Sequence, residues 1–142
     1  MKAVILGCGR LGKRVALKMM KEKKYSVVVI DRKTDALDSL GKDFEGKVMQ
    51  ADGSSVETYL EVMAELPEVF IALTSDDNTN LMAAQIARQK YKVAKVIARV
   101  DDPIRAKAFE ELGIETFCPT VLSEKKISKM VEKQEKEKED GE

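Results

Sequence analysis

Residues 1–12 read Met-Lys-Ala-Val-Ile-Leu-Gly-Cys-Gly-Arg-Leu-Gly, and this stretch decides the fold. Its apolar residues 3–6 have the length and composition of a buried strand, and three glycines follow at the spacing Gly-x-Gly-x-x-Gly. In a strand–turn–helix unit, Gly7 permits a tight turn, Gly9 lets the backbone approach a pyrophosphate, and Gly12 lets the helix pack closely on the strand. The phosphates would then lie at the helix N-terminus, where free N–H groups and the helix dipole favour an anion.

A carboxylate stands where such a unit needs one. Residues 27–30 form a second apolar run, and Asp31 ends it 19 residues after Gly12. At this position an acidic side chain accepts hydrogen bonds from ribose hydroxyls, and its charge repels a 2′-phosphate. The adjacent Arg32 complicates this, because an arginine here can accommodate that phosphate, cover the adenine, or remain a solvated turn charge. We favour a ligand with a non-phosphorylated ribose, such as NAD, AMP, ADP or ATP.

The rest of the chain repeats the pattern of a short apolar run, a turn and an amphipathic stretch. Strands are predicted at residues 3–6, 27–30, 47–50, 69–73, 95–99 and 115–117, and helices at 11–23, 34–41, 56–64, 78–90 and 103–112. This alternation predicts an α/β fold of the Rossmann type, a doubly wound parallel sheet in three α/β/α layers. We assign residues 1–118 to this domain.

The C-terminal part differs in composition from the domain. A last helix is expected to begin near Thr120, after Pro119, with Ile127, Met130 and Val131 as its apolar stripe. We assign it residues 119–131. Residues 132–142 have nothing to bury, so we expect a charged, frayed tail there.

Composition excludes several classes of function. The 142 residues include 25 basic and 25 acidic side chains, and this zero net charge argues against a nucleic-acid partner. No apolar run is long enough to cross a bilayer, and the N-terminus has no signal peptide. We therefore expect a cytoplasmic protein, without a disulfide between its two cysteines. Cys118 is expected to be buried and inert. Cys8 is either a small residue beside the turn or a thiol whose pKa the helix N-terminus lowers.

Further candidate residues follow the strands, because ligands of doubly wound sheets bind outside the carboxyl ends of the strands. After the third strand, Asp52 and Gly53 should line the adenine side. After the fourth strand, Thr74 is the best candidate for a ligand contact, whereas Asp77 or Asn78 can instead cap the next helix. Arg10 is either a phosphate ligand or a surface charge. The full candidate set is Gly7, Cys8, Gly9, Arg10, Leu11, Gly12, Asp31, Arg32, Asp52, Gly53, Ser54, Thr74, Ser75, Asn78 and Arg99.

The residues that common catalytic sites require are missing from the sequence. There is no histidine, no Gly-x-x-x-x-Gly-Lys-Ser/Thr loop, no Tyr-x-x-x-Lys pair in a predicted helix beside the site, and no Cys/His metal cluster. We therefore expect a binding protein and neither an enzyme nor a metal site. The alternative is an NAD(P)-dependent oxidoreductase domain whose active site another chain completes.

The order of the motifs resembles the N-terminal lobe of the RCK/KTN family, the TrkA-like regulatory subunits of potassium uptake systems. Beside the glycine turn and Val-Val-Val-Ile-Asp-Arg, the chain carries Ala-Asp-Gly-Ser, Ala-Leu-Thr-Ser-Asp-Asp-Asn-Thr-Asn and Val-Ile-Ala-Arg-Val-Asp-Asp-Pro. The last three pieces are the more specific ones. Residues 119–123, Pro-Thr-Val-Leu-Ser, look like the start of the family's crossover helix.

The resemblance implies a sensor of NAD(H), ATP, ADP or AMP that gates a membrane K⁺ transporter from its cytoplasmic face. It also implies a homodimer or a larger ring, with the apolar helices 81–87 and 104–112 at the subunit interface. Leu81, Ile86, Ile104 and Phe109 on these helices are either interface or core. Arg99 joins the nucleotide site on this basis, and Arg10 faces phosphate. Family members continue into a C-terminal lobe, so we expect either that a separate chain supplies this lobe or that the module works alone as a sensor.

Overall fold

A computed structural model describes residues 1–22 and 24–141 of the chain. Lys23, the predicted end of the first helix, and Glu142, the last residue of the predicted tail, lie outside the described residues. Most other predicted boundaries agree with the structure to within three residues.

Six parallel strands form one sheet in the order β3-β2-β1-β4-β5-β6, which confirms the predicted doubly wound topology. The chain order of the strands reverses between β1 and β4, so this pair marks the switch point where such folds bind ligands. The strands are β1 (Lys2–Leu6), β2 (Ser26–Asp31), β3 (Lys47–Gln50), β4 (Val69–Ala72), β5 (Lys95–Arg99) and β6 (Glu115–Phe117).

Helices cover both faces of the sheet and bury two apolar clusters, which confirms the three layers. On one face, Ala16 and Leu37 pack with Val29 of β2. On the other face, Tyr59 and Leu81 pack against a cluster that includes Phe70 of β4. The helices are α1 (Arg10–Lys21), α2 (Thr34–Asp38), α3 (Val56–Val62), α4 (Asp77–Gln85), the π-helical turn η1 (Ile86–Lys90), α5 (Pro103–Glu110) and α6 (Pro119–Asp140). Because η1 continues α4, the predicted helix 78–90 consists of these two elements.

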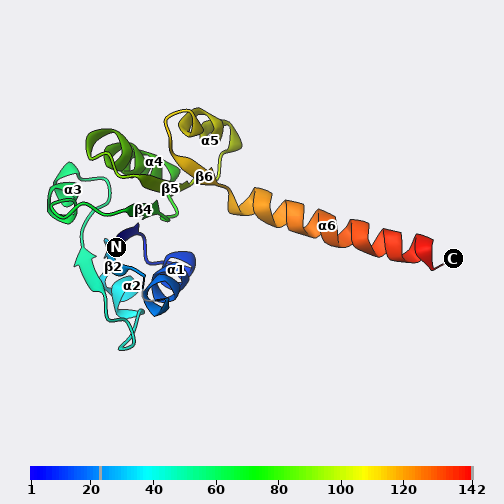
Figure 1. Ribbon diagram of the computed structural model, residues 1–142, viewed down its shortest axis with the longest axis horizontal. Coiled ribbons are helices and arrows are strands. Elements are labelled where there is room, and N and C mark those ends of the chain that lie inside the picture. Colours follow the sequence, from blue (N-terminus) through cyan, green and yellow to red (C-terminus); the bar gives the residue numbers. More distant parts are fainter. Residues whose placement is uncertain (23, 142) are drawn as a thin grey trace.

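The last helix differs most from the prediction. It continues to Asp140 and extends away from the domain as a single rod (Figure 1), so the predicted helix end at residue 131 was wrong. Glu132 and Lys136, like Lys133 and Glu137, are four residues apart, a spacing that stabilises helices and that a charge count overlooks. None of the described residues 119–140 is buried.

The four apolar residues that were assigned to either the interface or the core differ in their burial. Leu81 belongs to the core, with 2% of its surface exposed, and Ile86 and Phe109 pack partly buried against it. Ile104 is 82% exposed at the start of α5. Within the described residues, none of the helices combines the length and apolarity that a membrane span requires.

Candidate nucleotide site

The glycine turn joins β1 to α1 at the carboxyl edge of the sheet. Gly7 has a φ of +102°, and a Cβ built on it would lie 2.9 Å from the Leu73 carbonyl carbon and the Thr74 nitrogen. Its N–H donates to the Ile30 carbonyl over 2.8 Å. Glycine is therefore the only residue type that fits at position 7, between the ends of β2 and β4.

The other two glycines have the steric properties that their spacing predicts. A Cβ on Gly12 would lie 1.9 Å from the Gly7 oxygen, so α1 packs directly on the turn. Around a Cβ on Gly9, in contrast, no described atom lies within 4 Å. The space beside Gly9 is therefore open to a ligand that approaches the backbone.

The N-terminus of α1 is left without a side-chain cap. Gly9 is its N-cap residue, and no described side chain caps it or adds an acidic group to its first turn. By contrast, Asp76 caps α4 and Asp102 caps α5. Helices α2, α3 and α6 also lack a side-chain cap, but the first N–H groups of α1 are the uncapped ones beside the glycine turn, where they are available to an external anion. Arg10 and Leu11 are exposed in this first turn.

Asp31 connects the end of β2 to the glycine turn. Its Oδ2 accepts the N–H of Cys8 over 2.7 Å, and its Oδ1 accepts the N–H of Lys33 over 2.8 Å. The carboxylate is partly buried, and each oxygen keeps a lone pair for a further donor. Asp31 therefore holds the turn in place, a role that the sequence pattern does not indicate.

The two cysteines differ from expectation. Cys8 is 3% exposed, and burial together with the charge of Asp31 raises the pKa of its thiol, so the lowered pKa considered from the sequence was wrong. Cys118 was expected to be buried but is half-buried at the start of α6. Cys118 directly follows the last residue of β6 and therefore lies outside the sheet. Its Sγ lies 3.4 Å from the Asp101 carbonyl oxygen.

The Asp-Gly-Ser segment after β3 is organised by its own hydrogen bonds. The Asp52 carboxylate accepts the N–H of Ser54 over 2.8 Å and its hydroxyl over 2.7 Å. These bonds hold the pKa of Asp52 below its ordinary value. A Cβ on Gly53 would collide with the Leu6 side chain, and the buried Tyr59 hydroxyl donates to the Gly53 carbonyl. The segment is therefore fixed against the end of β1, beside the glycine turn.

Asn80, which is completely buried, organises the segment after β4. Its Oδ1 accepts the N–H of Thr74 over 2.9 Å and the Thr74 hydroxyl over 2.6 Å. Its Nδ2 donates to the carbonyls of Thr74 and Arg99 over 2.9 and 3.0 Å. One amide thus ties the ends of β4 and β5 together and directs Thr74. Asn80 was not among the candidate residues. Its position in the first turn of the predicted helix after the fourth strand was the only sequence feature that could have indicated it.

The capping assignment from the sequence needs correction. The N-cap of α4 is Asp76, whose Oδ2 accepts the Thr79 N–H over 3.1 Å, and neither Asp77 nor Asn78 has this role. Asp77 instead accepts the backbone N–H groups of Asp101 and Asp102. Helix α4 begins at Asp77, one residue earlier than predicted, so its N-cap is Asp76.

The remaining predicted residues lie at the same edge, with different partners. Asn78 accepts a hydrogen bond from Arg105 over 2.6 Å, and Arg99 pairs with Asp101 over 3.3 Å. Arg32 is exposed and its carbonyl accepts the Gln50 amide, while Ser75 is exposed after β4. The structure therefore brings the glycine turn, Asp31, the Asp52 segment and Thr74 to one edge, and turns Asn78 and Arg99 toward the β5–α5 loop. Ligand contact by any of these residues stays a prediction.

Comparisons with known proteins agree with this geometry. The model of the TrkA-N domain family matches residues 3–119. The Trk system potassium uptake protein TrkA of Streptomyces coelicolor is 38% identical over 118 residues, which cover 83% of this chain and 52% of that protein. The chain thus spans about half the length of this relative.

Solved structures show the same fold. The TrkA-N domain of the inner membrane protein ybaL from Escherichia coli superposes with a TM-score of 0.79 at 17% identity, covering 91% of this chain and 95% of that one. GsuK bound to ADP gives 0.77 at 18% identity, covering 94% of this chain and 34% of that one. The family match over most of the sequence and the shared architecture agree: the chain belongs to the TrkA-N domain family.

Proposed function

We propose that this chain is a regulatory, non-catalytic subunit of a potassium uptake system that binds an adenine nucleotide at the carboxyl edge of its sheet. The observation that carries the proposal is the uncapped N-terminus of α1 beside the open space at Gly9, with Asp31 at the end of the neighbouring strand. The TrkA relatives and the ADP-bound GsuK support the ligand class and the transport context.

The residues present fit such a ligand. Phosphate oxygens would accept the first N–H groups of α1, with Arg10 as a charged partner from the same turn. The ribose hydroxyls would donate to the remaining lone pairs of Asp31, whose charge disfavours a 2′-phosphate. The adenine would lie toward Asp52 and Gly53. NAD(H), ATP, ADP and AMP all share this adenosine portion.

The charge states at the site favour binding over catalysis. Hydrogen bonds from Ser54 and from Thr79 hold the pKa values of Asp52 and Asp76 below their ordinary values. Both carboxylates thus accept hydrogen bonds within their own loops, and neither has a pKa raised toward the working pH, at which a general acid or base works best. The alternative, an oxidoreductase domain completed by another chain, requires that the other chain supply this group.

Regulation requires that one nucleotide stabilise one arrangement of subunits better than another nucleotide does. We place the chain at the cytoplasmic face of a membrane K⁺ transporter, as a homodimer or larger ring. The exposed Ile104 and the apolar stripe of α6 at Ile127 and Met130 are available for these contacts.

Calorimetric titration of the full chain with ADP, ATP, AMP, NAD⁺ and NADH tests the site. We expect at least one ligand to bind with a Kd below about 1 mM, which corresponds to roughly 4 kcal/mol. Absence of any such binding would remove the nucleotide site. NADP⁺ should bind more weakly than NAD⁺. Turnover of NADH with metabolite pools, lost in a Gly9→Ala variant, would instead favour the oxidoreductase.

A further inference from the structure

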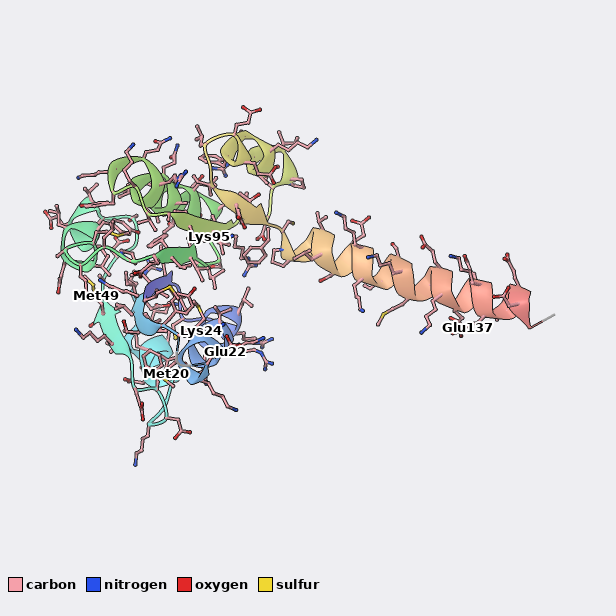
Figure 2. All side chains as sticks on the ribbon, in the orientation of Figure 1. Met20, Glu22, Lys24, Met49, Lys95 and Glu137 are labelled. Carbon is pink, nitrogen blue, oxygen red and sulfur yellow. The ribbon has the colours of Figure 1, made fainter. Side chains whose placement is uncertain are left out.

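A groove lies at the amino-terminal ends of the strands, whereas the nucleotide site is proposed at their carboxyl ends. β3 is the first strand in the sheet order, so its outer edge pairs with no described strand. Beside it is a cavity of about 620 Å³, lined by the amino-terminal ends of β1, β2 and β3 and by the end of α3. Figure 2 labels Met20 and Met49, which line this cavity, on the side of the domain away from α6.

The groove has an apolar floor. Val28 and Met49 are partly buried on neighbouring strands, Val62 is buried at the end of α3, and all three line the cavity. Val48, on the same edge strand, is 53% exposed. An open strand edge next to an apolar depression is the arrangement with which sheets accept an added strand, whose alternate side chains enter the depression.

The rim of the groove is acidic. Glu45, Glu61 and Glu65 line it, and all three are exposed. Lys2 also lines it, but its ammonium donates to the Val62 and Glu65 carbonyls over 2.7 and 2.6 Å, where it caps the C-terminus of α3. Lys47 supplies a positive charge on the edge strand itself. The rim therefore presents three carboxylates against the two lysines, of which Lys2 is already occupied by the two carbonyls.

We propose that the groove binds an extended, basic segment from the cytoplasmic surface of a membrane partner, added as a strand to β3. The carboxylates of the rim complement lysine and arginine side chains, and the floor takes the apolar side chains that alternate with them. Cytoplasmic loops of membrane proteins carry an excess of these basic residues. Only the origin of the segment rests on the proposed function, since the strand edge and the charges belong to the groove.

Other occupants fit less well. Residues 132–142 of this chain contain six acidic and three basic residues and no apolar side chain, so they would be repelled. A second copy would bring the same three glutamates to the seam. The groove also lies at the amino ends of strands whose carboxyl ends form the nucleotide site, so both sites can be filled at once.

The test is a titration of the ¹⁵N-labelled full chain with the acetylated peptide Lys-Val-Lys-Val-Lys-Val. Its controls are Glu-Val-Glu-Val-Glu-Val and a basic peptide that is N-methylated at alternate residues and cannot pair as a strand. We expect the basic peptide to bind with a Kd below about 1 mM and to shift the amide signals of Val48 and Met49. Glu61→Lys should weaken it at least tenfold. Glu111→Lys, the same change at an exposed site on the α5 side of the molecule, should leave it within twofold.

Equal binding of the acidic or the N-methylated peptide would overturn the proposal, and so would an unaltered affinity in Glu61→Lys. Light scattering that shows a dimer disrupted by Glu61→Lys would overturn it in favour of a second copy. ADP titration of the same variants separates the two proposals. Peptide binding without nucleotide binding would leave the groove and remove the sensor, and the reverse result would do the opposite.

Discussion

The backbone N–H of Cys8 lies 2.7 Å from Oδ2 of Asp31, so the carboxylate proposed for the ribose also holds the glycine turn. A single side chain thus serves ligand and loop at the same time. A substitution that removes it confounds the loss of a contact with the movement of the turn. The choice of variant decides what the experiment measures.

Asp31→Asn and Asp31→Ala separate the two roles. Asparagine keeps an acceptor oxygen for the Cys8 N–H but loses the acceptor for the exposed Lys33 N–H, so its free energy of unfolding should fall by about 1 kcal/mol, whereas alanine loses both acceptors and should lose about 1–3 kcal/mol. Both should weaken ADP binding roughly tenfold or more, because a charged acceptor of the ribose hydroxyls is lost. Urea unfolding and calorimetry measure the two effects, with Asp38→Asn on α2 as control. Undiminished ADP affinity in Asp31→Asn would remove Asp31 from the ribose.

Alanine at two glycines should give opposite phenotypes. Gly12→Ala places a methyl group 1.9 Å from the Gly7 oxygen, so α1 must move, and we expect a loss of about 3 kcal/mol of stability. Gly9→Ala enters open space at an ordinary φ of −78° and should leave the melting temperature nearly unchanged. It should nevertheless weaken nucleotide binding about tenfold or more, because the methyl group occupies space proposed for phosphate. Thermal melts and ADP titration decide, and tight binding by Gly9→Ala would contradict the site.

The comparison of these glycines shows what a sequence can predict. Gly7 and Gly12 occupy positions set by a local strand–turn–helix unit, whose steric demands depend only on nearby residues. The doubly wound parallel sheet followed from the alternation of strands and helices, which allows few topologies. Local pattern therefore sufficed for the fold, whereas the nucleotide site at the glycine turn stays a prediction.

Features that depend on distant residues were missed. The amide of Asn80 reaches the carbonyl of Arg99, 19 residues away, only because β4 and β5 are neighbours. Three consecutive capping residue types, Asp76, Asp77 and Asn78, could not be ranked without knowing where the chain leaves β4. The C-terminal part of α6 has the composition of a disordered tail. Only the four-residue spacing of its opposite charges distinguishes a helix from such a tail.

Asn80 offers a direct test of the buried network. Asn80→Ala would leave the Thr74 N–H and two carbonyls without their partner, and each unsatisfied buried group costs about 1–3 kcal/mol. We expect a total loss of about 3 kcal/mol, with weaker ADP binding because Thr74 is no longer held. Asn80→Asp should be at least as destabilising, since a carboxylate cannot donate to the carbonyls of Thr74 and Arg99. The exposed Asn78→Ala is the control, and equal stability of the Asn78 and Asn80 variants would contradict the network.

The α4 cap should make stability depend on pH. Hydrogen bonds from the hydroxyl and the N–H of Thr79 hold the pKa of Asp76 below its ordinary value of 3.8. A carboxylate with a depressed folded-state pKa stabilises the fold above its unfolded pKa, and this stabilisation is lost as the pH falls through the folded value. Asp76→Asn keeps a capping acceptor that does not titrate.

The stability difference between the original chain and Asp76→Asn should therefore be constant from pH 5 to 8, and should shift in favour of the variant below about pH 4. Urea unfolding across this range measures it. Acid effects from Asp52 and Glu68, whose pKa values are also lowered, are common to both proteins and cancel. A difference that does not change with pH would show that Asp76 does not cap α4 in solution.

The two thiols should react at very different rates. The thiolate is the reactive form, and Cys8 is both 3% exposed and shifted to a higher pKa by burial. Cys118 is half-buried at the start of α6 and should be reached without unfolding the domain. With a chromogenic disulfide reagent at pH 8, we expect one fast thiol per chain and a second that reacts only in denaturant. Cys118→Ser should abolish the fast phase and Cys8→Ala should preserve it.

Because the N–H of Cys8 holds Asp31, ADP should slow the reaction of Cys8 further by stabilising the closed turn. A fast phase that disappears in Cys8→Ala would mean that the glycine turn opens readily, and would contradict the anchored geometry on which the site depends.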